Sequence, residues 1–356
     1  MNSKKVLIAM SGGVDSSVTA ALIKDAGFDC VGATMKLFTN EDAGISHEKT
    51  CCSLSDTEDA RSVAARLGFD HYVFNFKDGF KRDVISRFIC AYESGATPNP
   101  CIDCNRFIKF KLLFDRAKIL GCDFIATGHY ARIEQRDGRY ILRKGLDESK
   151  DQSYVLYSLS QQALAHTLLP LGGLDKETVR QIADRLGFVN ASKPDSQDIC
   201  FVPDGDYAAF IEQYTHKTYP PGEFTDENGR VLGTHRGMIR YTVGQRRGLG
   251  LALPEPMYVK YKDTENNRVV LAPDSGLYSD TLTAHDFNWI LFEDPGWEFR
   301  GTVKTRYKAK AADATVIPLG GGRVKIVFDT PQRAITRGQA AVVYQGDAVV
   351  GGGTIE

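Results

Sequence analysis

The sequence predicts an α/β protein in which a doubly wound parallel sheet comes first, followed by a small central β-rich domain and a C-terminal β-barrel. Three observations support this fold class. The first half repeats an amphipathic helix, a glycine and an apolar strand; one strand runs directly into a Ser-Gly-Gly-Val-Asp-Ser turn; and beyond Tyr219–Gly222 short alternating segments replace the helices. We place the three domains at residues 1–205, 206–280 and 281–356.

Capping signals predict where several helices of the first half begin and end. Residues 55–58, Ser-Asp-Thr-Glu, form a capping box for a helix running to Leu67, and Asp175 is a predicted N-cap for a helix running to Leu186. Four helices end at a glycine that supplies the left-handed C-cap. These glycines are Gly27, Gly68, Gly121 and Gly187.

Four predicted strands of the first half are nearly continuous in apolar character, which favours a parallel sheet covered on both faces. They span residues 6–10, 31–35, 71–76 and 124–126. Ligands of such sheets bind beyond the carboxyl ends of the strands. We therefore expect residues 10–16, Met35 and residues 127–129 around one crevice.

The second half has the signals of small β domains. Asn228-Gly229 and Gly346-Asp347 predict hairpin turns. Residues 302–307, 323–329 and 340–344 are predicted strands of a compact barrel.

Composition narrows the class of protein. The 356 residues are 42% hydrophobic and 25% charged, and no apolar run is long enough to cross a membrane, so we expect a cytoplasmic globular protein with no membrane partner. Eight cysteines without a secretion signal indicate thiols, catalytic sulfur or cluster ligands. A net charge of −1 leaves nucleic-acid binding to local basic patches.

The turn at residues 11–16 predicts an anion site. Two glycines let backbone N–H groups close around a phosphate at the N-terminus of the following helix. No lysine lies in this turn, which distinguishes it from the P-loop. The site therefore suits a pyrophosphate that leaves intact better than transfer of a γ-phosphoryl group.

Two cysteine segments predict sulfur chemistry. Cys101 and Cys104 follow a proline-rich loop at a helix start, where the helix dipole is expected to lower the pKa of a thiol, and Cys200 lies on a later loop of the same predicted domain. Cys-x-x-Cys alone also fits half of a zinc site, an iron–sulfur ligand pair or two buried thiols. We predict core positions for Cys30, Cys90 and Cys122, and only a weak metal candidate at Cys51-Cys52.

The turn at residues 11–16 resembles that of the PP-loop ATP pyrophosphatases, whose fold is adenine nucleotide α hydrolase-like. The whole chain resembles the tRNA-specific 2-thiouridylase family. The matching segments, in chain order, are residues 11–16, 97–105, 127–130, 150–153, 199–201, 244–246 and 304–307. The resemblance implies sulfur insertion at C2 of the wobble uridine (U34) in tRNA anticodons, with ATP, Mg²⁺ and sulfur from a cysteine desulfurase or a sulfur-relay protein.

The resemblance also implies a role for each matching residue. Cys200 is expected to carry a persulfide and Cys104 to be the nucleophile, either resolving that persulfide or forming a disulfide with Cys200 as sulfur leaves. The expected nucleotide-binding residues are Ala9, Met10, Ser11, Gly12, Gly13, Val14, Asp15, Ser16, Met35 and Gly128. The expected contacts with the tRNA anticodon stem-loop are Thr97, Pro98, Asn99, His129, Lys150, Asp151, Gln152, Arg306, Tyr307 and Gln339.

One departure from the family opens an alternative mechanism. Cys101 stands where some members have an aspartate proposed as general base. Asp103 or Asp198 is a candidate substitute, and no base is needed if Cys104 is already largely a thiolate. Cys101, Cys104 and Cys200 are also three potential ligands of a [4Fe–4S] cluster, although no metal site is assigned. Basic sets around residues 236–247 and 304–310, interleaved with tyrosines, are candidate RNA surfaces.

Two other functions compete with thiolation. One is an adenylating PP-loop enzyme that acts on a small metabolite, and the other is a cysteine-based metal module that binds RNA. The paired cysteines argue against the first, and the turn at residues 11–16 has no role in the second.

Overall fold

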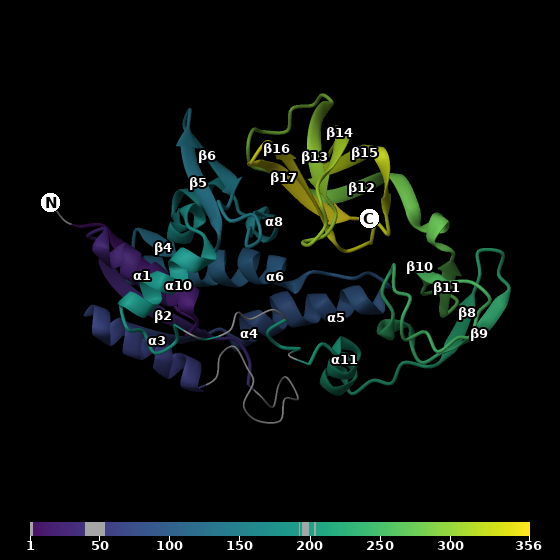
Figure 1. The fold of residues 1–356 in the computed structure, drawn as a ribbon, viewed down its shortest axis with the longest axis horizontal. Helices are drawn as coiled ribbons and strands as arrows, with labels where there is room; N and C mark the ends of the chain where they lie inside the picture. The colour runs from purple at the N-terminus through teal and green to yellow at the C-terminus, as the bar shows by residue number, and fades with distance from the viewer. Residues whose placement is uncertain (1–2, 40–53, 192, 194–198, 203) are drawn as a thin grey trace. The chain divides into compact units, whose positions relative to one another are not determined.

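The computed structural model describes residues 3–39, 54–191, 193, 199–202 and 204–356, and these form two compact units (Figure 1). The first unit comprises Met1–Val84, Cys101–Gly205 and Asp347–Val349. The second comprises Ile85–Pro100, Asp206–Gly346 and Val350–Glu356. Among the described residues, no helix has the length and apolar character needed to span a membrane. The expected features at Cys51-Cys52 and Asp198 lie outside the described residues.

A five-stranded sheet organises the first unit, in the order β3-β2-β1-β4-β7. Every pair of neighbouring strands is parallel, as the apolar strand pattern predicts. The strands are β1 (Lys5–Ala9), β2 (Asp29–Lys36), β3 (His71–Asn75), β4 (Phe124–Ala126) and β7 (Thr167–Leu168). Because β2 and β4 flank β1, the carboxyl ends of three strands meet at one edge, as a doubly wound sheet requires.

Helices α1 (Val14–Asp25), α3 (Leu54–Leu67) and α10 (Lys176–Arg185) pack around the main core of this unit, and α7 (Leu113–Ile119) packs on β4. Ile8, Val18 and Val179 are fully buried in that core. Burial of such side chains stabilises the fold by about 1.5–3 kcal/mol each. Among the described residues of the unit, the other α-helices are α4 (Lys77–Phe80), α6 (Pro100–Asp103), α8 (Ser153–Leu156) and α9 (Gln161–Ala165).

The predicted helix ends are largely confirmed. All four glycines have positive φ, as their C-cap role requires; they are Gly27, Gly68, Gly121 and Gly187. The Asp175 side chain accepts a hydrogen bond from Thr178 N and so caps α10. The capping box at residues 55–58 is wrong in its register, because α3 already includes Leu54 and Ser55 therefore lies inside the helix.

Cysteine burial separates the predicted core thiols. Cys30 and Cys122 are buried, and burial raises the pKa of both thiols. Cys90 is exposed, so its predicted core position is wrong. Its helix, α5 (Ser86–Glu93), buries the face that carries Phe88, Ile89 and Tyr92, and Cys90 lies off that face.

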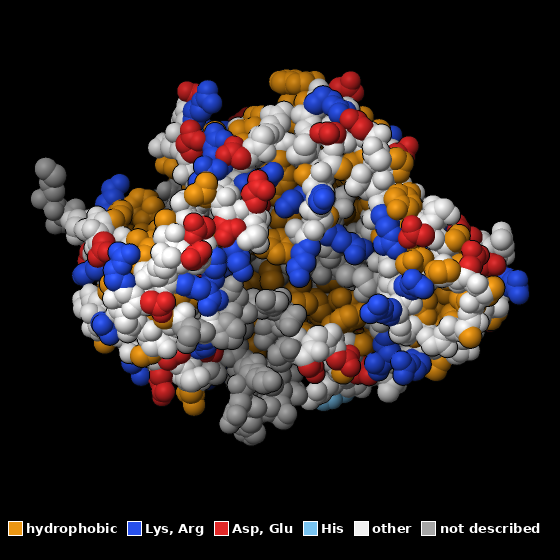
Figure 2. All heavy atoms as spheres, viewed as in Figure 1, with side chains coloured by type: hydrophobic (Ala, Val, Ile, Leu, Met, Phe, Trp, Pro, Cys, Tyr) orange, Lys and Arg blue, Asp and Glu red, His pale blue; other side chains and the backbone are white. Residues whose placement is uncertain are grey.

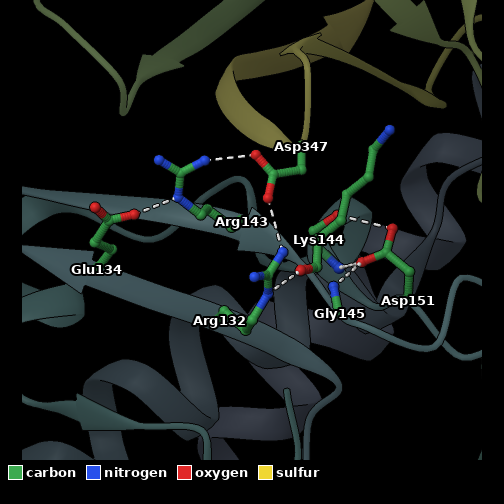
Figure 3. Close-up of polar contacts among 8 residues, drawn as sticks. Arg132, Glu134, Arg143, Lys144, Gly145, Asp151 and Asp347 are labelled. Carbon is green, nitrogen blue, oxygen red and sulfur yellow. Dashed lines mark hydrogen bonds and ion pairs between the residues drawn. The ribbon is translucent and has the colours of Figure 1, made fainter. Parts of the chain in front are cut away.

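An arginine-rich hairpin, β5 (Ala131–Arg136) and β6 (Arg139–Lys144), belongs to the first unit. Figure 3 shows Arg132 and Arg143 of this hairpin converging on Asp347, with N–O distances of 2.7 and 2.5 Å. Arg143 also contacts Glu134 across the hairpin. Asp347 lies in the predicted turn at Gly346-Asp347 and directly precedes Ala348, which pairs with Arg143 on β6. The hairpin is therefore tied to this turn by both charge and strand pairing.

The second unit contains a four-stranded sheet, α5, α11 (Tyr207–Thr215) and a six-stranded barrel. The four-stranded sheet has the order β10-β11-β8-β9, and its predicted Asn228-Gly229 turn joins β8 to β9. Phe224, Val259 and Leu271 are fully buried in its core. The strands are β8 (Gly222–Thr225), β9 (Val231–His235), β10 (Tyr258–Asp263) and β11 (Arg268–Ala272).

The barrel has the order β12-β15-β14-β13-β16-β17 and closes through pairing of β12 with β17. Closure pairs the two outer strands of these six with each other, and the interior is filled by side chains such as Val303, Ile326 and Val343. The strands are β12 (Tyr278–Trp289), β13 (Phe299–Lys304), β14 (Ala312–Gly320), β15 (Arg323–Arg333), β16 (Ala340–Gln345) and β17 (Ala348–Ile355). The predicted C-terminal barrel is confirmed.

Acidic and basic side chains alternate over the face drawn in Figure 2, in keeping with the net charge of −1. A field of one sign does not cover this face. Recognition of a polyanion must therefore depend on local groups of arginine and lysine side chains.

Candidate active site and RNA contacts

The turn after β1, which the sequence predicts to be a phosphate cradle, is closed by its own hydrogen bonds. Ser16 Oγ accepts from Ser11 N at 3.2 Å and donates to Gly13 O at 2.9 Å, which closes the turn on itself. Gly13 is the residue before α1 and has extended backbone angles, and no side chain caps this helix N-terminus. The first N–H groups of α1 are thus left for another acceptor, which is the arrangement of an anion site.

Gly12 is required by close packing as well as by conformation. Its φ is +77°, and a Cβ there would lie 2.2 Å from Asp56 O at the start of α3. From the other side, the Asn190 side-chain amide donates to Gly12 O at 2.8 Å and to Ser17 Oγ at 2.9 Å. Asn190 is 2% exposed, so a buried side chain holds the Gly12 carbonyl and the Ser17 hydroxyl in place.

Asp15 is the charged residue of the cradle and is already paired. Lys176 Nζ, from the first turn of α10, lies 2.8 Å from Asp15 Oδ1 and 2.9 Å from Oδ2. Tyr130 OH donates to Asp15 Oδ1 at 2.8 Å. Gly128 lies against this residue, because a Cβ on Gly128 would be 3.1 Å from Asp15 Cβ. The start of α1 and the segment after β4 therefore meet at Asp15, in keeping with the predicted grouping of residues 10–16 and 127–129.

The other predicted nucleotide-binding residues flank this cradle. Ala9 ends β1, Val14 begins α1, and Met10 N donates to Ala33 O at 2.8 Å. Met35 is half-buried near the carboxyl end of β2. Their location fits the predicted role, and their contact with a nucleotide stays a prediction.

His129 connects the end of β4 to the helical run at residues 100–119 that carries Cys104, which we call the cysteine-bearing helix. Its Nδ1 lies 2.7 Å from Thr127 Oγ1, and its Nε2 lies 3.4 Å from Lys109 Nζ. Burial, reinforced by the Lys109 charge, holds the pKa of His129 well below its ordinary value, so the ring is neutral at pH 7. A neutral ring that faces an ammonium group accepts at Nε2 and donates from Nδ1. Its predicted contact with tRNA therefore depends on a ring that is 8% exposed.

Cys104 begins a π-helical stretch, Cys104–Leu112, that continues into α7. The helical run starts earlier than the sequence predicts, with α6 at Pro100, so Cys104 lies in its second turn. Burial raises the pKa of the Cys104 thiol to about 11, although the Lys109 charge opposes this effect. The predicted lowering of this pKa is wrong, because desolvation of the thiolate outweighs the helix dipole and the nearby lysine.

Cys200 belongs to the same unit as Cys104 and is likewise half-buried. The next residue, Phe201, is 1% exposed and packs edge-to-face on Phe80 of α4, with ring centroids 5.7 Å apart. The neighbouring Gly79 faces Leu112 at the end of the π-helical stretch, where an added Cβ would lie 2.5 Å from Leu112 Cδ1. Helix α4 therefore contacts both the segment that carries Cys200 and the helix that carries Cys104.

The three candidate cluster ligands are not gathered as a metal site. Within the described part of the chain, no group of three or more His, Cys, Asp or Glu side chains is placed to hold a metal ion. Cys101 is exposed, whereas Cys104 and Cys200 are half-buried. The [4Fe–4S] alternative thus has no preformed ligand set among these residues and stays a hypothesis.

In the first unit, the predicted RNA segment at residues 150–152 is mostly engaged with protein. Asp151 is 7% exposed; its carboxylate accepts from Gly145 N at 3.1 Å (Figure 3) and from Ser153 N at 3.0 Å. Gln152 accepts from Tyr130 N at 3.0 Å. Asp151 and Gln152 therefore shape the loop, while Lys150 is half-buried beside them.

In the second unit, two predicted tRNA contacts meet although they are 242 residues apart in sequence. Gln339 Nε2 donates to Thr97 O at 2.7 Å, and Thr97 N donates to Arg337 O at 2.9 Å. Between them, Gly338 has a φ of +86° and lies so close that a Cβ would be 2.9 Å from Ala96 Cβ. Pro98 and Asn99 follow this docked segment and are half-buried.

Arg306 lines a basic cavity in the second unit. The cavity has a volume of about 580 Å³ and is lined by Tyr207, Arg240, Thr242, Val243, Gly244, Gln245, Arg247 and Arg306. Arg306 Nη2 donates to Val243 O and Ala334 O, both at 3.0 Å, and to Thr336 Oγ1. Arg306 therefore holds the cavity wall together as well as supplying charge, whereas Arg247 is exposed. Tyr307 follows Arg306 and is half-buried.

Three family models match the chain. Residues 4–204 match the tRNA methyl transferase HUP domain, residues 208–273 match the tRNA methyl transferase PRC-barrel domain, and residues 279–355 match the aminomethyltransferase beta-barrel domain. These descriptions name domains and not one enzyme family, and similarity to individual proteins is more specific. The tRNA-specific 2-thiouridylase of Acetivibrio thermocellus is 52% identical over 100% of both chains.

The chain belongs to the tRNA-specific 2-thiouridylase family. A second member, from Thermoanaerobacter pseudethanolicus, is 50% identical over 99% of this chain and 98% of its own length. Among solved structures, the U34-tRNA thiolase from Methanococcus maripaludis with its [4Fe-4S] cluster is 19% identical, with a TM-score of 0.36 over 61% of this chain and 72% of that one. That likeness is too weak to bear on the cluster hypothesis.

Membership of the 2-thiouridylase family favours thiolation over the two competing functions. Three residues that support the site were not predicted: Lys176, Asn190 and Lys109. The first two reach the cradle from segments more than 150 residues away in sequence. Lys109 is visible in the sequence only as one of several basic residues on a helix, and its pairing with His129 depends on the tertiary structure.

Proposed function

We propose that this chain catalyses ATP-dependent 2-thiolation of the wobble uridine of tRNA. The supporting observation is its full-length similarity to 2-thiouridylases, in a chain that retains the phosphate cradle and both cysteine segments. We place its action in the cytoplasm, with a cysteine desulfurase or a sulfur-relay protein as sulfur donor.

In the activation step, O2 of the uracil attacks the α-phosphorus of ATP, the bond from that phosphorus to the bridging oxygen breaks, and pyrophosphate leaves. The N-terminus of α1 and the closed turn at residues 11–16 hold the departing phosphates. Mg²⁺, when bound, neutralises phosphate charge, and Asp15 is the carboxylate placed to hold it. A single carboxylate fits, because Mg²⁺ takes its other ligands from phosphates and water.

In the sulfur step, the Cys104 thiolate attacks the inner sulfur of a Cys200 persulfide. A disulfide between the two residues forms and hydrosulfide leaves, which then displaces AMP from C2. In the alternative order, the outer sulfur attacks C2 first and displaces AMP; Cys104 then attacks the Cys200 sulfur, which forms the disulfide and leaves the outer sulfur on C2. Both orders end with one disulfide, so an external thiol must reduce it before the next turnover.

The raised pKa of Cys104 limits how much of the attacking thiolate is present at neutral pH. At neutral pH its thiol is protonated, so it does not attack the persulfide until a base or a charge change removes the proton. Asp103 and Asp198 remain the candidate bases. Lys109 is the cation available to stabilise the thiolate once it forms.

Contact with RNA is proposed for the cavity that Arg240, Arg247 and Arg306 line, and for the Thr97 and Gln339 region. The arginines provide phosphate neutralisation, whereas Tyr207 of the cavity wall is stacked on Tyr92 and Tyr241 is buried. Arg247 is the informative residue to change, because substitution of Arg306 would also break three hydrogen bonds of the wall.

The function is tested by mass spectrometry of nucleosides after incubation with ATP, a sulfur donor and an anticodon stem-loop transcript. Wild type should form 2-thiouridine, and Cys104→Ser and Cys200→Ser should not. Cys90→Ser is the matched control, because Cys90 is exposed and belongs to the other unit. Thiouridine formed by either variant would remove that cysteine from the mechanism. No thiouridine from the wild type under these conditions would contradict the function.

Cys101→Ser separates persulfide from cluster chemistry. Full thiolation by this variant, with no iron in the purified protein, supports the persulfide mechanism. Loss of activity together with loss of iron and of its visible absorbance supports a cluster held by Cys101.

A further inference from the structure

The phosphate cradle lacks a lysine of its own, yet the fold supplies one from a distant helix. Lys176 is 161 residues from Asp15 in sequence and contacts both oxygens of the Asp15 carboxylate. Its side chain is 11% exposed and lies 5.8 Å from the centre of the Tyr130 ring. An ammonium group this deeply buried requires an anionic partner, and in this structure Asp15 is that partner.

The position of Lys176 is fixed by its own helix. It is the first residue of α10, directly after the N-cap Asp175, and its backbone N–H donates to Asp147 Oδ2 at 3.2 Å. Four rotatable side-chain bonds separate this fixed backbone from the ammonium group. The lysine can therefore change partner within the cradle without a movement of α10.

Asp15 cannot serve two cations equally. Its carboxylate already accepts from Lys176 and from Tyr130. A divalent cation at Asp15 would be repelled by an ammonium group 2.8 Å from the same oxygen. When the cation takes Asp15 from Lys176, the phosphates that bind with the cation provide Lys176 with a new anionic partner.

We propose that Lys176 is a nucleotide-binding residue that exchanges partners: it pairs with Asp15 in the empty cradle and with a phosphate oxygen when Mg²⁺–ATP is bound, which leaves Asp15 to the metal. The inference rests on the proposed ATP site and extends it. Lys176 then plays the part of the lysine that the turn itself lacks, and it neutralises charge on the pyrophosphate as that group leaves. A purely structural ion pair would predict no such exchange.

Calorimetric titration of the whole protein with ATP, with pyrophosphate and with AMP tests the exchange without requiring turnover. Lys176→Met should weaken binding of Mg²⁺–ATP and of pyrophosphate by about 10- to 100-fold, as loss of a charged hydrogen bond does, and leave AMP binding unchanged. Lys176→Arg should restore most of the affinity. Lys24→Met, on the last turn of α1 away from the cradle, is the matched control.

Asp15→Asn provides an independent readout of the same exchange. It should abolish the gain in ATP affinity that Mg²⁺ provides, yet ATP binding measured with a chelator should become tighter than in the wild type, because Lys176 is released. Equal affinity of Lys176→Met and wild type for ATP and pyrophosphate, in protein that melts cooperatively, would overturn the exchange alone. A wild-type protein that binds no ATP would overturn the proposed function as well.

Discussion

The phosphate cradle and the cysteine-bearing helix lie in one unit but are prepared for reaction in opposite ways. In the cradle, polar groups are paired and aligned: Asp15 has its cation, and Asn190 pins the Gly12 carbonyl. On the helix, the Cys104 thiol is in a desolvated environment that raises its pKa to about 11. The polar groups of the first site are already paired, and the thiol of the second is protonated at neutral pH.

This difference fits the order of the proposed reaction. A thiolate that existed before uridine was activated would be open to oxidation, whereas a pre-formed cradle has no such cost. The segment Thr127–His129 contacts both sites: Gly128 lies against Asp15, and His129 contacts Lys109 of the cysteine-bearing helix. Three consecutive residues after β4 thus join the proposed nucleotide site to Lys109, whose charge acts on Cys104.

The largest effect is expected from Gly12→Ala, which tests how rigidly the cradle is assembled. The new Cβ would meet Asp56 O at 2.2 Å on a backbone with positive φ, so we expect a loss of about 2–4 kcal/mol in the free energy of unfolding and loss of ATP binding. Urea denaturation and ATP titration measure both.

Gly13→Ala is the matched control for stability, because its φ is −91° and its added Cβ would meet nothing closer than Ser11 Oγ at 3.6 Å. It should change the free energy of unfolding by less than about 1 kcal/mol. Equal stability of the two alanine variants would show that the backbone of the turn moves to accept the new Cβ. The turn would then not be rigidly assembled, contrary to the comparison drawn above.

A smaller effect, on rate alone, is expected at Cys104. With a pKa of about 11, the thiol should be alkylated roughly tenfold faster for each pH unit between 7 and 10 in the protein without ligands. Lys109→Met should slow alkylation at pH 8 by about tenfold, since it removes the charge that opposes desolvation, while Lys109→Arg should not. Mass spectrometry of the Cys104 peptide measures the rate. A plateau in rate below pH 8 would show that the thiol is already ionised.

The smallest effect is expected in the acid stability of the segment that joins the two sites. The pKa of His129 is lowered by burial, so below about pH 6.5 the unfolded chain takes up a proton that the folded chain does not. Stability should therefore fall as the pH drops from 7 to 5, with at most about 1.4 kcal/mol per pH unit from this residue.

His129→Gln should reduce that slope, with the remainder due to His71 and His235, whose pKa values burial also lowers. The exposed His216 provides the control, and His216→Gln should leave the slope unchanged. An identical slope in wild type and His129→Gln would place His129 in a hydrated environment and weaken the link to Lys109.

Sequence reasoning succeeded where the signal is local. The four strands, the glycine C-caps and the Asp175 cap depend on residues within one turn or one strand of each other, and all are found. It failed for the pKa of Cys104, because a helix dipole can be read from the chain but desolvation cannot. It also failed for Cys90, since helix position alone did not show which side of α5 is buried.

The sequence by itself determined the fold class, the phosphate turn and the two cysteine segments, because each is written in a contiguous pattern of glycines, apolar residues and thiols. Only the tertiary structure decided which charges and which burial surround them. Lys176 reaches Asp15 and Gln339 reaches Thr97 through contacts between segments far apart in the chain, and burial removes the hydration of the Cys104 thiol. Electrostatic and solvation energies depend on distance in space, and that distance is set when the chain folds.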